Sequence, residues 1–185
     1  MLQPTSLKSL TKLHINPTNN TNIFIYLDKI KGERTMQRYE KKTLIQTSQK
    51  ALYDFHLDVK NLQVISPKDV SVRLLNKDFV PHIGGVLRLK TVKSFVPMIW
   101  EVRIDAMKEP RLLVDVAERS PFAFWKHSHI FTQVNETQCE LRDVVEYALP
   151  FGFLGRLFHG FVEGELEKMF AFRHEITKKI LEKNV

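Results

Sequence analysis

The sequence has a single cysteine, Cys139, and only seven glycines in 185 residues. One cysteine excludes an internal disulfide bond and any zinc site built from several thiolates. No stretch approaches the ~20 consecutive apolar residues of a membrane-spanning helix. The longest apolar run near the N-terminus, Ile23–Leu27, is too short for a secretion signal. We therefore expect a cytoplasmic protein without an integral membrane segment, in which redox chemistry is not the function.

The chain carries an excess of positive charge, but this charge is not arranged as a nucleic-acid-binding surface. The net charge is +7, of which residues 1–35 contribute +3 and the remainder +4. In the remainder, basic and acidic residues alternate, as in the segment 165–168. Such mixing is typical of a solvated surface and not of a stripe that follows phosphates. We expect no nucleic-acid partner.

The chain divides by composition into residues 1–35 and residues 36–185. The first segment is rich in Asn, Thr, Lys and Ser without a hydrophobic period, which predicts a poorly ordered tail whose removal leaves folding intact. Lys31-Gly32-Glu33 can be encoded by a purine-rich stretch like a bacterial ribosome-binding site, so one hypothesis is that the natural start is Met36. The alternative is a native flexible extension. Residues 36–185 are expected to form one ligand-binding domain.

The domain shows the patterns of strands between helices. Residues 38–46 have the composition of a strand, and Thr47 and Ser48 suggest the cap of one or two short helices. Six further strands are predicted at 69–76, 86–92, 97–107, 111–118, 122–134 and 139–149. After Pro150 an apolar stripe of helical period runs nearly to the end; its residues are Leu154, Leu157, Phe158, Phe161, Val162, Leu166, Met169, Phe170, Ile176 and Ile180.

This order predicts an α+β fold in which a curved antiparallel sheet of about seven strands wraps around the long C-terminal helix, with two short helices after the first strand. A twisted antiparallel sheet must bury one face, and the final helix is the only predicted element long enough to cover it. A curved sheet and a straight helix leave space between them, and small ligands commonly bind in such spaces.

Three stretches of the sequence carry a family resemblance. They are Trp125–Phe131, Asp143–Gly155 and Phe170–Arg173. With these stretches, residues 36–185 resemble the SRPBCC superfamily of START and pollen-allergen-like proteins, in particular a bacterial ligand-binding branch related to polyketide cyclases and dehydrases. The resemblance implies the helix-grip fold and a cavity for a hydrophobic ligand, without indicating which ligand. One departure is Asn135–Thr137, which replaces the family's usual glycine-rich turn.

Alternation along the strands places ionisable side chains on faces that we expect to be buried. His127 and His129 share a face with Trp125 and Phe131, and Asp143 shares one with Leu141, Val145, Tyr147 and Leu149. In the strand 111–118, alternation groups Glu118 with Leu112, Val114 and Val116. In the strand 97–107, Trp100 shares a face with Met98, Val102 and Ile104. Four ionisable groups are therefore expected on an otherwise apolar wall.

Three roles for these ionisable groups stay open at this point. They can satisfy one another in a structural network, orient the polar part of a ligand, or act in catalysis with a histidine as general base beside Asp143. A His-x-His pair with a carboxylate can also bind a metal ion. Two histidines spaced along a strand are far commoner than a zinc site, so no metal and no other cofactor is expected.

We predict a protein that binds a small hydrophobic molecule, such as a lipid, an isoprenoid or a polyketide-like compound, and we do not expect an enzyme. The predicted ligand-binding residues are Trp100, Glu118, Trp125, His127, His129, Asp143, Tyr147, Phe158, Phe161, Met169 and Arg173. One alternative is a cyclase, dehydratase or hydrolase whose catalytic candidates are His127, His129 and Asp143. Another is a module that presents its fold to a protein partner, about whose nature the sequence is silent. The segment 151–157 is interpreted as a helix entry packed on the sheet, and as an alternative it gates the cavity or contacts a membrane.

Overall fold

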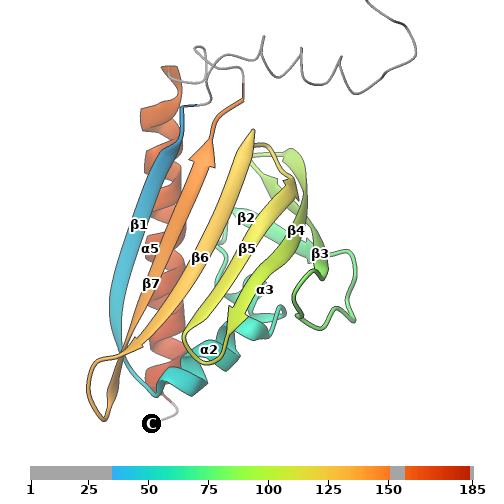
Figure 1. Cartoon of the computed structure of the whole chain (residues 1–185). Helices are drawn as coiled ribbons and strands as arrows, with labels where there is room; N and C mark the ends of the chain where they lie inside the picture. The colour runs from blue at the N-terminus through green and yellow to red at the C-terminus, as the bar shows by residue number, and fades with distance from the viewer. Residues whose placement is uncertain (1–34, 151–156, 184–185) are drawn as a thin grey trace, which may run out of the picture. The chain divides into compact units, whose positions relative to one another are not determined.

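A computed structural model describes residues 35–150 and 157–183 (Figure 1). The predicted tail 1–35 lies outside these residues except for Thr35, as does the predicted helix entry 151–157 except for Leu157. The helices are α2 (Gln49–Leu57), α3 (Asn61–Val64) and α5 (His159–Glu182). The strands are β1 (Gln37–Gln46), β2 (Val70–Leu74), β3 (Val86–Lys93), β4 (Val96–Lys108), β5 (Leu112–Arg119), β6 (Phe124–Gln133) and β7 (Gln138–Ala148).

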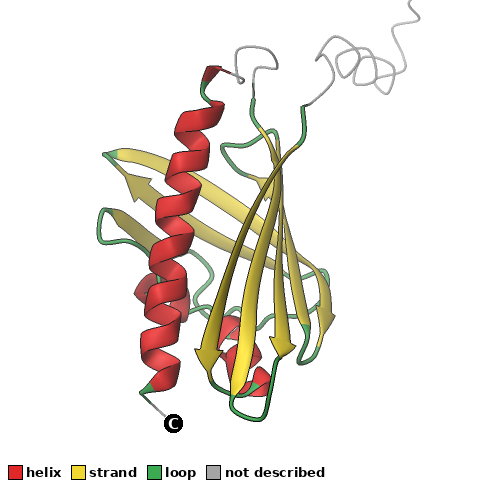
Figure 2. Cartoon of the chain, turned by 90° about the vertical axis from the view of Figure 1, so that its left-hand side faces the viewer, coloured by secondary structure: helices red, strands yellow, loops and turns green. Residues whose placement is uncertain are grey.

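The seven strands form one antiparallel sheet in the order β1-β7-β6-β5-β4-β3-β2. Each strand after β1 pairs with its neighbour along the chain, and β1 joins the far edge beside β7. The sheet curls around one side of α5, which lies along β1 and β7 (Figures 1 and 2). The predicted helix-grip fold is confirmed. No helix in the described ranges is long and apolar enough to cross a membrane.

Local sequence features account for the turns of the chain. The Ser48 side chain accepts a hydrogen bond from the Ala51 amide at 3.1 Å, which caps α2 as predicted. In the β6–β7 turn, Asn135 Oδ1 accepts hydrogen bonds from the amides of Thr137 and Gln138. An asparagine side chain that binds the backbone two residues on replaces a glycine turn, so the departure from the family pattern leaves the hairpin intact.

The curvature of the sheet has a source in β4, its longest strand. The register with β5 shifts between Glu101 and Val102 and again between Ile104 and Ala106. Such bulges increase the local twist and bend the strand. The same side of the sheet packs against α5 along β1 and against α2 at β6 and β7.

The core consists of two apolar clusters with polar residues between them. One cluster gathers around Phe131, Leu141 and Leu181, together with α2. The other gathers around Trp125, Val145 and Phe170. Along β6, β7 and α5 alike, the residues between the two clusters are polar: His127 and His129, Asp143, and His174. The candidate site therefore lies in the middle of the core.

Helix α5 has two apolar sides, and only one is buried on the sheet. Its buried residues are Leu166, Phe170, His174, Thr177 and Leu181. A second side, with Met169, Phe172, Ile176 and Ile180, is half-buried. The predicted stripe is wrong at its beginning, because Leu157, Phe158 and Phe161 are exposed by 72%, 62% and 70%. The helical period continues there, but the first residue of α5 that packs against the core is the half-buried Val162, and the first buried one is Leu166.

Candidate functional site

The polar cluster is assembled by the register of three strands. His129 on β6 lies opposite Asp143 on β7, and His127 on β6 lies opposite Asp115 on β5. Because directly opposed residues of antiparallel strands point to the same face, all four side chains project toward the concave side. Asp143 and His127 are only 3% and 4% exposed.

Asp143 is the centre of the cluster. Its Oδ1 accepts a hydrogen bond from His129 Nδ1 at 2.7 Å and lies 3.3 Å from His127 Nε2. Its Oδ2 accepts a hydrogen bond from His174 Nε2 at 3.0 Å. Asp143 thus contacts one imidazole on the helix and two on the neighbouring strand.

The carboxylate that β5 contributes to the cluster is Asp115 and not the predicted Glu118. Asp115 Oδ2 lies 3.7 Å from His127 Nδ1 and 3.6 Å from His129 Nε2. Glu118 points to the opposite, outer face, where it binds Arg103 Nε at 3.0 Å. The expected inward orientation of Glu118 is wrong, because β5 is apolar on both faces and alternation did not identify its inner side.

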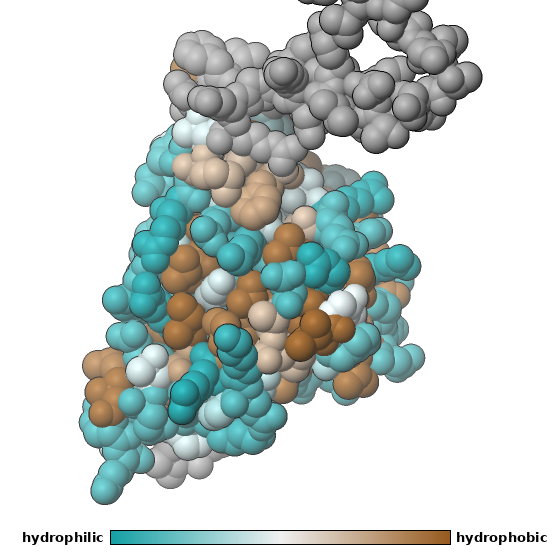
Figure 3. Space-filling model, viewed as in Figure 1, coloured by the Kyte–Doolittle hydropathy of each residue, from teal (hydrophilic) through white to brown (hydrophobic). Residues whose placement is uncertain are grey.

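The outer face of the sheet has an apolar centre of its own, which explains why alternation in β5 did not identify the inner face. Apolar side chains gather over the middle of the sheet in the space-filling view of that side (Figure 3). Val114 and Val144 are both nearly buried although they alternate with inward residues. Burial on both faces removes the contrast on which a face assignment depends.

Two further histidines, which were not among the predicted site residues, also belong to the cluster. His174 on α5 joins Asp143 to β1, because its Nδ1 lies 2.8 Å from Thr43 Oγ1. His56 on α2 lies over the ring of His129, with 5.1 Å between the ring centroids. The helical spacing of four from Phe170 was a signal for His174, whereas nothing local marked His56.

The charges of the cluster follow from burial and from the two carboxylates. Burial opposes a charge on His129, but Asp143 and Asp115 raise its pKa to about 9. Burial opposes the carboxylate of Asp143, yet His129 and His127 hold its pKa well below its ordinary value. Burial and the neighbouring His129 lower the pKa of His127, and they lower that of His56 to about 3. Near pH 7 the result is a charged His129–Asp143 pair beside the neutral rings of His127 and His56.

Arg173 adds a cation near the two carboxylates of this cluster. Its guanidinium carbon lies 5.6 Å from the centre of the Phe170 ring. Burial lowers its pKa, while the charges of Asp143 and Asp115 raise it. Its Nε atom is buried without a hydrogen-bond partner in the described part of the chain. Arg173 therefore neither binds a carboxylate of the sheet directly nor extends freely into solvent.

The remaining predicted ligand-binding residues fall into two groups. Trp100, Trp125 and Tyr147 form an aromatic wall with Phe122, in which neighbouring ring centroids are 4.7 to 6.5 Å apart. Met169 is half-buried beside this wall. Phe158 and Phe161, in contrast, are exposed and contribute to neither the wall nor the polar cluster.

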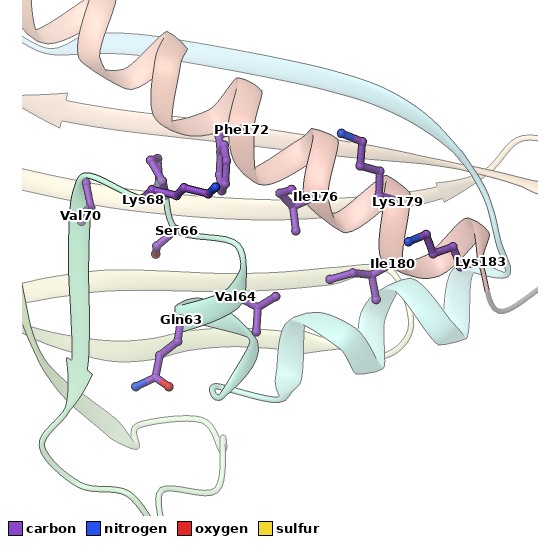
Figure 4. Close-up of a pocket in the computed structure, with 11 residues that line it drawn as sticks. Gln63, Val64, Ser66, Lys68, Val70, Phe172, Ile176, Lys179, Ile180 and Lys183 are labelled. Carbon is purple, nitrogen blue, oxygen red and sulfur yellow. The ribbon is translucent and has the colours of Figure 1, made fainter.

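A separate pocket of about 540 Å³ lies between α5, α3 and β2 (Figure 4). Its apolar lining includes Phe172, Ile176 and Ile180 on α5 and Val64 on α3. Three lysines, Lys68, Lys179 and Lys183, line it as well. None of the predicted ligand-binding residues is among those that line this pocket in the described ranges.

Comparison with protein-family models finds no match, and no curated protein matches either. Many solved structures share the fold. An aromatase/cyclase from a Streptomyces species superposes with a TM-score of 0.65 at 15% identity, over 80% of this chain and 95% of that chain. A START superfamily protein from Mycobacterium smegmatis gives 0.61 at 11% identity, over 80% and 99%. Norcoclaurine synthase from Thalictrum flavum, in complex with dopamine and hydroxybenzaldehyde, gives 0.63 at 10% identity, over 98% and 99%.

Proposed function

We propose that this chain, which has the helix-grip fold of START superfamily proteins, binds a small and largely apolar molecule between α5 and the edge of the sheet formed by β2. The structural neighbours include a protein in complex with small aromatic molecules and an aromatase/cyclase. At identities of 10 to 15% they establish the fold alone, so the argument for binding rests on this chain's own residues.

The observation that carries the proposal is the second apolar side of α5. Phe172, Ile176 and Ile180 are half-buried and face a pocket of about 540 Å³, within the range of ~300–1,000 Å³ of ligand sites. Figure 4 shows Ile176 and Ile180 pointing from α5 toward Val64 on α3. An apolar ligand in this space removes from water the aliphatic surface that the sheet leaves uncovered.

The lysines of the pocket indicate the polar end of the ligand. Lys68 lies on the segment before β2, and Lys179 and Lys183 lie at the end of α5. Each is a cation on an apolar stem, and Lys179 also pairs with Glu175. Such side chains suit an amphiphile whose head group is an anion. A fatty-acid-like carboxylate with an aliphatic chain has this chemistry.

A competition experiment tests the proposal. The anionic dye 1-anilinonaphthalene-8-sulfonate is titrated into the protein and then displaced with dodecanoate or, as the uncharged match, dodecanol. We expect one saturable site, from which dodecanoate displaces the dye more effectively, with an advantage that falls as salt is added. Native mass spectrometry of freshly purified protein would identify a ligand that copurifies.

Two variants locate the site. Ile176→Glu places a carboxylate in the pocket and is expected to weaken dye binding at least about tenfold. Phe95→Asn is the matched control, because Phe95 is 98% exposed in a hairpin with φ of 67°, where asparagine is tolerated. If Phe95→Asn weakens dye binding and Ile176→Glu does not, the dye binds at the hairpin that contains Phe95 and the proposal fails.

The enzyme predicted as an alternative has one favourable observation. His129 is oriented by Asp143 through a 2.7 Å hydrogen bond, and with a pKa raised to about 9 its charged ring has the form of a general acid near pH 7. Catalysis by His127, His129 and Asp143 stays a prediction, as do the sheet residues proposed to contact ligand and the cytoplasmic location.

A further inference from the structure

The corrected register of β5 brings three metal-ligating side chains together. Asp115, His127 and His129 each offer one ligand atom, and these atoms all lie within 4.8 Å of one another. Asp115 Oδ2 is 3.7 Å from His127 Nδ1 and 3.6 Å from His129 Nε2. Sequence alternation put Glu118 and not Asp115 on this face, so the third ligand was missing from the sequence prediction.

The spacing of the ligand atoms fits a small divalent ion. Zinc binds imidazole nitrogen and carboxylate oxygen at ~2.0–2.2 Å, so neighbouring ligand atoms of a tetrahedral site are roughly 3.3–3.5 Å apart. The two distances from Asp115 exceed this range by only a few tenths of an ångström. Rotation of the side chains suffices to close that difference, since both histidines are adjacent along one strand face.

The ring nitrogens that face away from Asp115 meet a carboxylate. His129 Nδ1 donates to Asp143 at 2.7 Å, and His127 Nε2 lies 3.3 Å from the same oxygen. His127 Nε2 is buried and makes no well-directed hydrogen bond within the described residues. Histidines that bind metal ions commonly direct their second nitrogen at a carboxylate, which fixes the ring and strengthens the ligand. Asp143 occupies that position for both rings.

The site keeps access to solvent and holds two carboxylates. The side chains of Asp115 and His129 are each 14% exposed, whereas that of Asp143 is 4% exposed. Two carboxylates, Asp115 and Asp143, face the guanidinium of Arg173 and the charged imidazole of His129. A divalent ion takes the place of the proton on His129 Nε2, and three protein ligands leave a coordination position for water or for a ligand of the concave face.

We propose that Asp115 Oδ2, His127 Nδ1 and His129 Nε2 bind a divalent first-row transition metal ion, with Asp143 as the positioning residue behind both imidazoles. Two imidazoles and one carboxylate suit Zn²⁺, Fe²⁺ and Co²⁺ better than Mg²⁺ or Ca²⁺, which prefer oxygen ligands. The site goes beyond ligand binding in the α5–α3 pocket, and its failure would leave that proposal untouched.

The test uses the full chain without a histidine tag, freed of metal with a chelator and dialysed. Isothermal titration with Zn²⁺ is expected to show one site per chain. Titration with Co²⁺ is expected to give the visible absorption of a four- or five-coordinate ion, which differs from the weak spectrum of the hydrated ion. Mg²⁺ at the same concentrations is expected to show no binding.

Variants assign the ligands. His129→Gln and Asp115→Asn each remove a ligand and are expected to weaken Zn²⁺ binding more than about 100-fold, whereas Asp143→Asn weakens it about 10- to 100-fold. His159→Gln is the control, because His159 forms the surface His–carboxylate pair with Glu163 at 3.9 Å. His159→Gln is expected to bind Zn²⁺ like the wild type.

Two results would overturn the proposal. One is a wild-type protein that binds neither Zn²⁺ nor Co²⁺, which would make the cluster a hydrogen-bond network only. The other is zinc binding that survives in Asp115→Asn and is lost in His159→Gln, which would place the ion on the surface. If a core variant does not fold, the Co²⁺ spectrum of the wild type and the mildest variant, Asp115→Asn, still decide the question.

Discussion

His174 on α5 and Asp143 on β7 are joined by a 3.0 Å hydrogen bond in which both side chains are almost completely buried. The other nitrogen of His174 lies 2.8 Å from Thr43 on β1. The helix is therefore fixed to two strands by one imidazole, next to the apolar contacts of Phe170. Because Asp143 also accepts from His129, a change at Asp143 affects the helix and the strand β6 together.

Replacing His174 tests this link between helix and sheet. His174→Ala is expected to lower the free energy of unfolding by about 2–3 kcal/mol, because it leaves one oxygen of a buried carboxylate without its donor. Urea denaturation followed by circular dichroism measures the change. His159→Ala on the exposed side of the same helix is the control and is expected to stay within about 0.5 kcal/mol of the wild type. Equal stability of the two variants would contradict the assigned role of His174.

The stability of the metal-free protein is expected to depend on pH through His129. The raised pKa of His129, about 9 against an ordinary 6.5, means that its contribution is fully present below pH 6.5 and is lost as the pH rises through about 9. The charged groups that act on it are Asp143 and Asp115, and the rings of His127 and His56 lie beside it. The urea concentration at the midpoint of unfolding, measured in the presence of a chelator, should therefore fall as the pH is raised from 6 to 10.

Asp143→Asn separates the ion pair from the hydrogen bond. Asparagine keeps the shape and can still accept from His129, so the variant is expected to lose about 2 kcal/mol at pH 6–7 and much less at pH 10, where His129 is neutral in both proteins. Denaturation curves of both proteins across this range provide the measurement. A constant difference between them at all pH values would show that Asp143 acts through packing and not through charge.

The two phenylalanines of α5 are expected to behave oppositely. Phe170 is 0% exposed and Phe161 is 70% exposed. Phe170→Ala should cost about 3–5 kcal/mol through lost transfer energy and a cavity, whereas Phe161→Ala should stay within about 0.5 kcal/mol of the wild type. Urea melts compare them directly. A large cost for Phe161→Ala would restore the sequence prediction that its side chain is buried.

Cys139 is expected to be inert in the native protein. Its side chain is fully buried, and burial raises the pKa of its thiol to about 11. Since the thiolate is the reactive form, an Ellman titration should show no reactive thiol under native conditions and one per chain in denaturant. Rapid native modification would mean that β7 separates from its neighbours on the time scale of the reaction.

The fold and two faces of the site follow from the hydrophobic patterns of the strands and of the last helix. The alternation of β6 and β7 is clearer than that of β5, because the face of His127, His129 and Asp143 is otherwise large and apolar, whereas the other face is mostly polar. A strand with one apolar face has one stable orientation, since the reverse would expose its hydrophobic residues. The long C-terminal helix followed in the same way from its helical period.

The residues that complete the site depend on the packing of elements that are distant in the sequence. Asp115 replaced Glu118 because β5 is apolar on both faces, and only pairing with β6 selected the inner one. His174 and His56 joined the cluster from helices that are distant in sequence. The apolar residues of α5 keep the helical period through Phe161. The period shows which side of the helix is apolar, but it does not show how far along the helix the sheet covers that side. Contacts between distant elements depend on how the sheet curves and where the helix lies on it, and no local pattern encodes that placement.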